Sequence, residues 1–455
     1  MRRLERRAII CLALAMVLFI GLGVFVYRFF VHGAEWATFY GNQNLYTGEA
    51  LSSGKIYDRN GILLMESGDG EVWYNDDYSI RRGTLHAVGD TQGNISTSAL
   101  VAYRSKIIGY NPITGTYKIT GRNEDLTLTI DAEASSVAYQ WLSEYDAGCV
   151  GVYNYKTGEV LCAVSTPGFD PMDPPVLEEG DDSGIYINRF FSSTITPGSI
   201  FKTVTAAAEI EKAAWQDFRY TCYGEREVGD EYVTCMQAHG EQDLQDALAN
   251  SCNCAFSYIA EELGEGVMIE YVDKLGLTKV YDMSGIKNAA GSFSFPTDSP
   301  IDLSWAGVGQ YMDELNPCSM MIYMGAIASE GTSAVPKMLV SDSILYSVFQ
   351  EDKLDMIRDK SVELLEPTTA SVLRNMMKYN VTDNYGTWNF PGLELGAKTG
   401  TGEVEDRYPN ATFAGFLDDS EHPYAFIVCV ENSGSGQDYA APIANAVLQV
   451  LVANN

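Results

Sequence analysis

The chain has 455 residues, of which 46% are hydrophobic and 20% charged, and its 42 glycines and 15 prolines are spread along it. This composition is typical of a globular protein with two or three structural units and excludes a collagen-like or disordered chain. Asp and Glu number 61 against 30 Lys and Arg, so the net charge is 30 − 61 = −31. A surface this acidic repels phosphate backbones, which excludes nucleic acid as a partner.

The N-terminal segment predicts a membrane anchor. Residues 1–7 carry four arginines and one glutamate, and no charged residue occurs from Ala8 to Tyr27. About 20 apolar residues in a helix cross the roughly 30 Å of membrane hydrocarbon. The arginines favour a cytoplasmic N-terminus, so we expect a cytoplasmic tail (1–7), one transmembrane helix (8–30) and an extracytoplasmic remainder. A cleaved signal peptide is the alternative, although it would have a shorter apolar region.

The rest of the chain divides by its pattern of residues. Residues 31–125 are polar, with short β-like runs, and predict a small β-rich module beside the membrane. From Leu126 a strand leads into a helix, and residues 149–165 alternate like a β-hairpin. A final amphipathic helix follows three strand-like runs, 396–402, 411–417 and 424–432. Strands at both ends with helical sequence between them predict one sheet built from distant segments, in an α+β domain over 126–455.

The sequence contains nine cysteines and four histidines. Four cysteines lie in apolar runs, where buried thiols are expected: Cys149, Cys162, Cys318 and Cys429. Cys222 and Cys235 flank a short polar stretch that a hairpin could close, and the sequence leaves open whether they form a disulfide. No Cys-x-x-Cys motif occurs and the histidines show no ligand spacing, so we expect neither a metal site nor a cofactor.

The first candidate catalytic motif is Ser199-Ile-Phe-Lys202, which follows Thr-Pro-Gly and opens a helical pattern. Ser and Lys three residues apart share a helix face, so a neutral lysine amine could take the proton of Ser199 and make it a nucleophile. Burial and nearby cations would have to lower the pKa of Lys202. The same spacing occurs at Ser52–Lys55 and Ser284–Lys287, but only Ser199 has a turn before it and a helix after it.

The second motif is Ser251-Cys252-Asn253, the only Ser-x-Asn of the sequence. In an extended segment both polar side chains would point the same way, giving a hydroxyl that relays a proton and an amide that binds a substrate amide. A helix C-terminal cap is the alternative interpretation.

The third motif is Lys398-Thr399-Gly400-Thr401 on a predicted strand. Alternation places the hydroxyls of Thr399 and Thr401 on one face, where they could hold a carboxylate, and Gly400 would let a substrate backbone come close. A second Lys-Thr-Gly, residues 156–158, lies at the tip of the predicted hairpin, where glycine serves the turn.

These motifs, in this order and context, resemble those of the penicillin-binding transpeptidases. Three further segments are similar to that family: GKIYDRNGILL (54–64), STPGFDP (165–171) and NRFFSSTITPGSIFK (188–202). A short anchor and a pedestal before the catalytic domain match class B, the monofunctional peptidoglycan D,D-transpeptidases of the penicillin-binding protein A or division type. The resemblance implies a domain like that of the serine β-lactamases, an antiparallel sheet flanked by helices, after a β-rich pedestal.

The resemblance also implies roles for single residues. Ser199 would be acylated by a stem peptide ending in D-Ala-D-Ala, and backbone N–H groups of Ser199 and Thr401 would form the oxyanion hole. The implied catalytic residues are Ser199, Lys202, Ser251 and Thr401, and the implied substrate-binding residues are Asn253, Lys398, Thr399, Gly400 and Thr401. One departure is Gly309-Gln310-Tyr311, where the family often has Gly-Gln-Gly.

The implied partners are peptidoglycan stem peptides, β-lactam antibiotics as inhibitors and a polytopic membrane glycosyltransferase. A D,D-carboxypeptidase is one alternative, because it differs only in using water to release the acyl group. A catalytically silent scaffold for a cell-wall glycan polymerase is another. A β-lactamase would need a deacylating group that we do not find. The sequence leaves open a role in elongation, division or sporulation.

Overall fold

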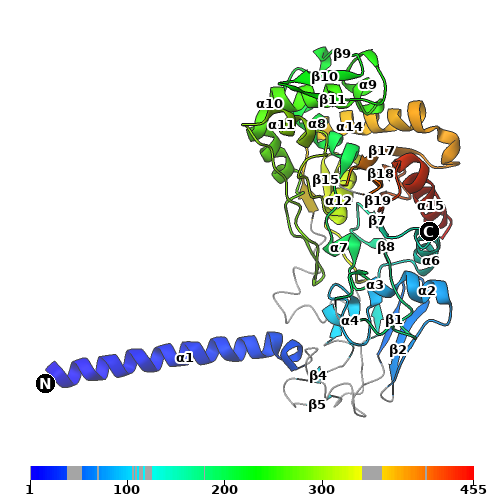
Figure 1. Ribbon diagram of the computed structural model, residues 1–455. Helices are drawn as coiled ribbons and strands as arrows, with labels where there is room; N and C mark the ends of the chain where they lie inside the picture. The colour runs from blue at the N-terminus through cyan, green and yellow to red at the C-terminus, as the bar shows by residue number, and fades with distance from the viewer. Residues whose placement is uncertain are drawn as a thin grey trace.

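The computed structural model describes residues 2–37, 54–68, 71–104, 107, 110–111, 116–117, 125–178, 180–340, 361–404 and 407–454. Three parts follow one another along the chain: a long N-terminal helix, a small module and a large mixed domain (Figure 1). Much of the predicted 31–125 module lies outside the described residues, as does Ser52 of the first Ser-x-x-Lys pattern.

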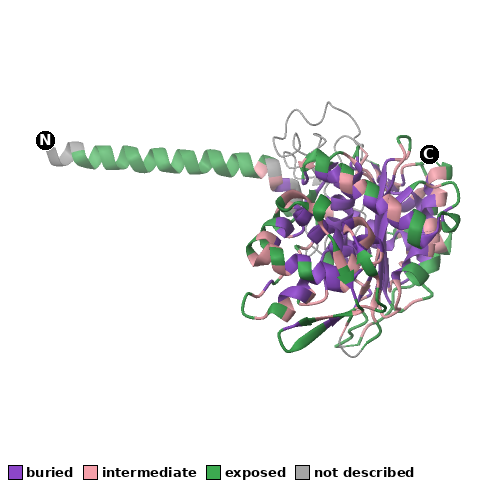
Figure 2. Cartoon of the chain, turned by 90° about the horizontal axis from the view of Figure 1, so that it is seen from above, coloured by how far each residue is buried: buried purple, intermediate pink, exposed green. Residues whose placement is uncertain are grey.

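The N-terminal helix α1 runs from Arg2 to Ala37. Within its apolar span, Arg6–Phe30, the most apolar 18-residue window has a mean hydropathy of 3.0, and none of that window is buried inside the protein. Figure 2 shows this helix projecting from the body with exposed residues along its length. Apolar side chains exposed over 25 residues need a nonpolar environment, and the span is long enough to cross a membrane. The predicted apolar N-terminal helix is therefore confirmed.

The small module is a pedestal of short strands and short helices below the large domain in Figure 1. Its four-stranded sheet has the order β3-β2-β1-β6. The strands are β1 (Lys55–Tyr57), β2 (Leu63–Gly68), β3 (Glu71–Tyr74) and β6 (Leu126–Thr127). The other elements are α2 (Tyr78–Gly83), α3 (Leu85–Val88), α4 (Ala99–Ala102), β4 (Tyr110–Asn111) and β5 (Thr116–Tyr117). Because β6 pairs with β1, the strand at Leu126 completes the pedestal sheet.

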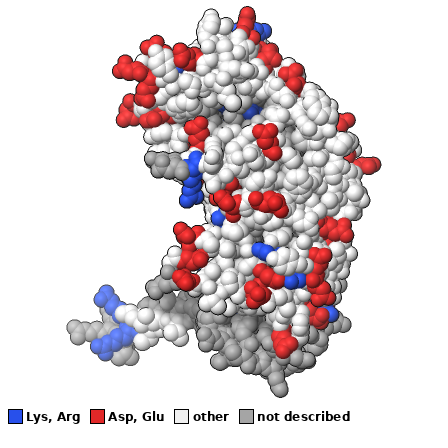
Figure 3. All heavy atoms as spheres, turned by 45° about the vertical axis from the view of Figure 1, so that its right-hand side comes forward, with Lys and Arg blue, Asp and Glu red and all other residues white. Residues whose placement is uncertain are grey.

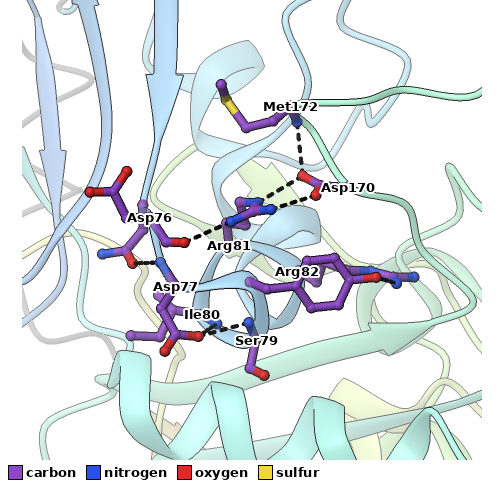
Figure 4. Close-up of polar contacts among 10 residues, drawn as sticks. Asp76, Asp77, Ser79, Ile80, Arg81, Arg82, Asp170 and Met172 are labelled. Atoms are coloured by element: carbon purple, nitrogen blue, oxygen red, sulfur yellow. Dashed lines mark hydrogen bonds and ion pairs between the residues drawn. The ribbon is translucent and has the colours of Figure 1, made fainter.

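Helix α2 joins the pedestal to the large domain through a charged pair (Figure 4). Asp77 begins the helix by accepting hydrogen bonds from the N–H groups of Ser79 and Ile80. Arg81 then donates two hydrogen bonds to Asp170, from Nε at 2.8 Å and from Nη2 at 2.6 Å. Asp170 belongs to the 165–171 segment of the large domain, and the guanidinium of Arg81 lowers the pKa of its carboxyl group. This two-point contact fixes the pedestal against that segment.

We expect the Arg81–Asp170 pair to contribute about 1.5–3 kcal/mol of coupling, because both side chains are mostly buried (16% and 17% exposed) and bond at two points. A double-mutant cycle with Arg81→Met and Asp170→Asn, followed by urea unfolding, measures this coupling. The matched control is Lys212–Glu270, an exposed pair (38% and 51%) that should couple by less than about 1 kcal/mol. Equal coupling in both pairs would contradict the prediction.

The large domain is built on a five-stranded antiparallel sheet with the order β17-β18-β19-β7-β8. The strands are β7 (Gly148–Asn154), β8 (Val160–Thr166), β17 (Leu395–Gly402), β18 (Asn410–Leu417) and β19 (Tyr424–Val430). The predicted hairpin and the three predicted C-terminal strands are thus confirmed as one sheet made of distant segments.

Both faces of this sheet are buried, because helices cover each of them. Val150 and Val152 of β7 pack into the core on the side of α6 (Ala132–Leu142) and α15 (Ala441–Asn454). Their neighbours Cys149 and Tyr153 pack into the other core, with α12 (Pro317–Ala328). This alternation follows the two-residue period of a strand. The C-terminus lies beside α6 in Figure 1.

The segment between β8 and β17 is mainly helical. Besides α12, its longer helices are α8 (Lys202–Lys212), α9 (Leu244–Ala249), α10 (Asn253–Lys274), α11 (Pro300–Ala306) and α14 (Pro367–Asn380). A small β region lies at the top of Figure 1 and contains β9 (Tyr220–Cys222), β10 (Glu225–Val228), β11 (Glu231–Thr234) and β12 (Gly240–Gln242). The remaining short elements are α7 (Arg189–Ser192), η3 (Trp215–Asp217), β13 (Asp282–Met283), β14 (Ile286–Lys287), β15 (Thr332–Ala334), β16 (Ser361–Glu363), η6 (Thr387–Asn389) and η7 (Gly436–Ala440).

The four cysteines predicted to be buried are buried, and Cys222 and Cys235 are free thiols that form no disulfide with each other.

On the face drawn in Figure 3, Asp and Glu side chains are scattered over most of the folded part. The acidic excess of the composition is therefore spread over this face and not gathered in one patch.

Candidate active site

Ser199 lies on η2 (Gly198–Phe201), a single 3-10 turn that leads directly into α8. The predicted turn followed by a helix is therefore present at this motif. Ser199 is half-buried, whereas Lys202, the first residue of α8, is fully buried. Lys202 Nζ lies 3.0 Å from Ser199 Oγ. The hydroxyl is thus accessible, and its neighbouring amine is shielded from water.

The polar neighbours of Lys202 can pair fully with a neutral amine. Its Nζ lies 2.6 Å from the carbonyl oxygen of Ser251 and 2.6 Å from Oδ1 of Asn253, and both of these atoms are acceptors only. A neutral amine has two N–H donors, which these two acceptors use. Its lone pair then remains for a hydroxyl proton, from Ser199 or from Ser251, whose Oγ lies 3.1 Å away. No carboxylate pairs with Lys202 among the described residues.

Burial lowers the pKa of Lys202 to about 8, against a partial opposing effect of the thiols of Cys252, Cys235 and Cys254. Removing a charged amine from water favours its neutral form. Near neutral pH a useful fraction of the amine is therefore unprotonated. This is the protonation state that a general base needs.

The Ser251–Asn253 motif is a turn between two helices, so its predicted extended conformation is wrong. Helix α9 ends just before Ser251, and Asn253 is the first residue of α10. Ser251 adopts a φ of 51°, a left-handed conformation that costs a non-glycine residue about 1 kcal/mol or more. The turn nevertheless directs both polar side chains at Lys202, which is what the chemistry requires.

Lys398 of β17 brings the third motif to the same place. Its Nζ lies 3.0 Å from Ser251 Oγ and donates to the carbonyl of Thr399 at 2.9 Å. The side chain is fully buried. Burial, reinforced by the charge of Lys202, lowers the pKa of Lys398. The hydroxyl of Ser251 thus lies between two amines, a suitable position for passing a proton.

The two threonines of the third motif have different surroundings. The N–H and hydroxyl groups of Thr399 both donate to the hydroxyl of Tyr385, at 3.1 and 3.2 Å. Tyr385 ends the π-helix η5 (Val381–Tyr385), and we did not predict it from the sequence because only the fold brings it to β17. The hydroxyl of Thr401 has no hydrogen-bond partner in the part of the chain that is described. Thr401 is therefore the threonine whose hydroxyl is available for a substrate carboxylate.

Two glycines allow η2 and β17 to approach each other. Gly198 has a φ of 59°, and a Cβ there would lie well under 3.0 Å from the carbonyl oxygen of Thr401. A Cβ on Gly400 would meet Thr412 and the carbonyl of Pro197. The protein itself thus requires a glycine at position 400, and the close approach of a substrate backbone there stays a prediction.

Gln310 holds the end of β17 beside the nucleophile. Its Nε2 donates to the carbonyl of Thr401 at 2.5 Å, and its Oε1 accepts from the N–H of Glu403 at 3.0 Å. The carbonyl of the preceding Gly309 accepts from the N–H of Gly198. The Gly-Gln pair therefore contacts both η2 and β17, and the departure at Tyr311 leaves these contacts intact. The family pattern is the sequence signal that could have identified Gln310.

The repeated motifs lie away from this site. Ser284 occupies the turn between β13 and β14, with a φ of 60°, and no helix follows it. The second Lys-Thr-Gly lies on the turn between β7 and β8, where Gly158 has a φ of 80°. Five of the predicted residues, in contrast, are linked by hydrogen bonds through Lys202 and Lys398: Ser199, Lys202, Ser251, Asn253 and Lys398.

Comparison with known proteins agrees with the family resemblance of the sequence motifs. Residues 148–449 match the family model of the penicillin-binding protein transpeptidase domain. The chain is 24% identical to stage V sporulation protein D of Bacillus subtilis over 86% of this chain and 60% of that protein. It is 24% identical to the peptidoglycan D,D-transpeptidase PbpA of Mycolicibacterium smegmatis over 82% of this chain and 89% of that protein.

Solved structures share the fold. Penicillin-binding protein A of M. tuberculosis, in an imipenem acyl-enzyme complex, superposes with a TM-score of 0.73 at 20% identity, covering 89% of this chain and 99% of that one. PBP2 of Pseudomonas aeruginosa gives a TM-score of 0.71 at 20% identity, covering 88% and 96%. The catalytic-domain fold, the pedestal and the family match agree. The chain therefore belongs to the penicillin-binding transpeptidase family, with class B penicillin-binding proteins as its relatives.

Proposed function

We propose that this protein is a membrane-anchored serine D,D-transpeptidase that cross-links peptidoglycan stem peptides through an acyl-enzyme on Ser199 and is inhibited by β-lactams. The observation that carries the proposal is the position of Lys202 Nζ, which lies within 3.1 Å of the hydroxyls of Ser199 and Ser251 while both of its N–H donors have acceptors. A buried neutral amine in contact with an accessible serine hydroxyl is an activated nucleophile.

Acylation starts when Ser199 Oγ attacks the carbonyl of the penultimate D-Ala, and Lys202 takes the hydroxyl proton. Ser251 contacts both Lys202 and Lys398, and it relays a proton to the leaving amine of the terminal D-Ala. The C–N bond of the peptide breaks and an ester to Ser199 forms. An amine from a second stem peptide then attacks the ester, which restores the serine and creates the cross-link.

Other residues of the site bind and orient the substrate. Asn253 contacts Lys202 through Oδ1 and donates from Nδ2 to the carbonyl of Thr234, which leaves one N–H and one oxygen lone pair of its amide for a substrate amide. The terminal carboxylate binds Lys398 and the hydroxyls of Thr401 and Thr399, the latter after leaving Tyr385. The N–H groups of Ser199 and Thr401 stabilise the tetrahedral oxyanion, a contribution of several kcal/mol in comparable sites.

The N-terminal helix places this chemistry outside the cell in our proposal. Arginines precede the apolar span, so the tail stays in the cytoplasm and the catalytic domain lies on the far side of a bacterial cell membrane. Two solved relatives carry the words peptidoglycan glycosyltransferase in their names. A membrane glycosyltransferase that supplies glycan strands is accordingly the partner that we propose for the helix and pedestal.

The test uses the full chain in detergent, incubated with penicillin G and measured by intact mass. We expect one covalent adduct per chain in the wild type and none in Ser199→Ala. Ser284→Ala is the matched control, because Ser284 has the same Ser-x-x-Lys spacing outside the site, and it should keep the adduct. An unmodified wild-type chain with intact penicillin would support the scaffold alternative, and hydrolysed penicillin without an adduct would indicate a β-lactamase.

A second assay separates transpeptidase from carboxypeptidase activity. A synthetic stem pentapeptide ending in D-Ala-D-Ala is supplied with an excess of a D-amino acid as acceptor. We expect the exchanged peptide as the main product, released D-Ala in equal amount, and no product from Ser199→Ala. Hydrolysis without exchange would favour the D,D-carboxypeptidase.

Gln310→Ala should slow acylation about tenfold. The variant loses two hydrogen bonds worth about 1 kcal/mol each, one to the carbonyl of Thr401 and one from the N–H of Glu403, and these bonds hold the end of β17. Gln310→Glu keeps the acceptor for Glu403 but loses the donor to Thr401, so it should be slow as well. The control is Gln449→Ala on the distant helix α15, which removes the hydrogen bond from Gln449 to the carbonyl of Pro391. Stopped-flow acylation with penicillin measures the rates. A rate equal to the wild type in Gln310→Glu would show that the bond to Thr401 is dispensable.

A further inference from the structure

Three cysteines and a histidine from three separate segments meet behind the Ser251–Asn253 turn. Cys222 ends β9, Cys235 and His239 lie in the loop between β11 and β12, and Cys252 caps the N-terminus of α10. Their ligand atoms all lie within 4.8 Å of one another. We propose that Cys222, Cys235, His239 and Cys252 bind one zinc ion, which fixes the small β region to the Ser251–Asn253 motif.

The spacing of the sulfur atoms fits coordination better than a disulfide. Cys235 Sγ lies 3.8 Å from Cys252 Sγ. Zinc–sulfur bonds of about 2.3 Å in a tetrahedron place two sulfurs about 3.8 Å apart, whereas a disulfide needs about 2.05 Å. Three thiolates and an imidazole are soft and borderline ligands, a set that selects zinc over calcium or magnesium.

Backbone groups around the three sulfurs are arranged as they are for bound thiolates. Each sulfur accepts one backbone N–H at 3.4 Å: Cys222 from Gly224, Cys235 from Cys254, and Cys252 from Ala255. Such N–H donors stabilise negative charge on metal-bound sulfur. The hydrogen bond from the N–H of Ala255 also places the sulfur of Cys252 at the N-terminus of α10, where the helix dipole favours a thiolate.

The histidine supplies an independent indication. Nδ1 of His239 is buried, and among the described residues it has no hydrogen-bond partner. A buried imidazole nitrogen without a partner is costly unless something else binds it. A zinc ion at the centre of the cluster would satisfy it.

Cys254 is a fourth nearby cysteine, and its surroundings distinguish it from the four ligands. Its Sγ lies 3.5 Å from Cys235 Sγ, but it donates to the carbonyl of Val233 at 3.5 Å. A carbonyl oxygen repels a thiolate, so this sulfur keeps its proton. Cys254 thus packs beside the site without binding the metal.

The small β region needs such an anchor. Only four of residues 220–242 are buried, namely Cys222, Val228, Val233 and Gln242. That is too little apolar burial to hold four short strands in place, and structural metals commonly replace a core in regions of this kind. The proposed site differs from the sequence expectation of no metal site, because its four residues come from three segments that no single motif spans.

The zinc ion would also position the catalytic turn. Cys252 lies between Ser251 and Asn253, the two residues that contact Lys202. Ser251 holds an unfavourable φ of 51°, which persists only where its surroundings enforce it. A metal bond to the adjacent residue provides that constraint. Cys252 is accordingly a positioning residue, not a catalytic one.

The test measures metal and thiols on the full chain in detergent, after gel filtration in metal-free buffer. We expect about one zinc per chain, and alkylation of the denatured protein should find nine reduced cysteines. Cobalt exchanged for zinc should show thiolate-to-cobalt charge-transfer absorption. A disulfide among the cluster cysteines, or a chain without metal after zinc is supplied, would overturn the proposal.

Substitutions test the ligand set. Cys235→Ser and His239→Asn should lose most of the zinc, whereas Cys254→Ser and the membrane-helix control Cys11→Ser should keep it. Hydrogen exchange then tests the positioning role without any enzymatic assay: removing zinc with a chelator should raise exchange at least tenfold in residues 220–242 and 250–254, and zinc should restore protection. Zinc retained in both Cys235→Ser and His239→Asn would identify an adventitious ion only, and unchanged exchange would remove the positioning role.

Discussion

Lys202→Met should slow acylation of Ser199 by penicillin about 10³-fold, because methionine fills the same space but cannot accept the serine proton. The fold should persist, since the side chain is buried among packed residues and methionine is apolar. Stopped-flow acylation monitored by intact mass gives the rate. Lys212→Met is the control on the same helix, and it removes only an exposed pair with Glu270.

The wild-type rate should also depend on pH in a defined direction. Burial lowers the pKa of Lys202 to about 8, so the neutral amine is the minor form below that pH. The acylation rate should therefore fall about tenfold per pH unit below 8 and level off above it. The groups that face Lys202 and modulate this profile are Lys398 and the thiols of Cys252, Cys235 and Cys254.

Lys202→Met should lack this rise with pH, because no amine titrates at the serine. If the variant acylates within tenfold of the wild type, or keeps the same pH profile, Lys202 is not the general base. Thermal unfolding of both proteins separates a loss of chemistry from a loss of fold.

The sequence predicted those parts of the fold that depend on local pattern. Short apolar runs identified the hairpin of β7 and β8 and the three C-terminal strands, because these strands pack both of their faces against helices. The turn before Ser199 and the helix after it were likewise readable from Pro, Gly and an apolar period. These signals are local, so they need no knowledge of the partner segment.

The contacts that complete the site were not readable in this way. Tyr385 acts on the backbone of β17 from a segment that no spacing marks, and Gln310 is marked only by the family pattern that begins at Gly309. The Ser251–Asn253 motif was expected to be extended, but the helix that follows begins at Asn253 and forces a left-handed turn at Ser251. The residues of the proposed zinc site were unreadable for the same reason, because their three segments converge only in the folded chain.

Gly198→Ala should reduce acylation about 10²-fold, because the new Cβ would press on backbone atoms of Thr401 and Gly402, which cannot move aside as a side chain can. Relief of this overlap must separate η2 from β17, and with them the N–H groups of Ser199 and Thr401, which form the oxyanion hole in our proposal. A displacement of about 1 Å in such a site costs on the order of 10² in rate. Acylation rates with penicillin, and thermal unfolding of each variant, measure the two effects.

Gly229→Ala separates this close approach from simple backbone strain. Gly229 has a φ of 64°, nearly that of Gly198, but a Cβ there meets nothing within 4 Å. Its alanine variant pays only the left-handed penalty of about 1 kcal/mol and should acylate at the wild-type rate. Equal acylation in Gly198→Ala and Gly229→Ala would show that the contact between η2 and β17 is not what sets the oxyanion hole. A loss of acylation in Gly198→Ala alone would instead show that the absence of a Cβ at Gly198 sets the distance between Ser199 and β17.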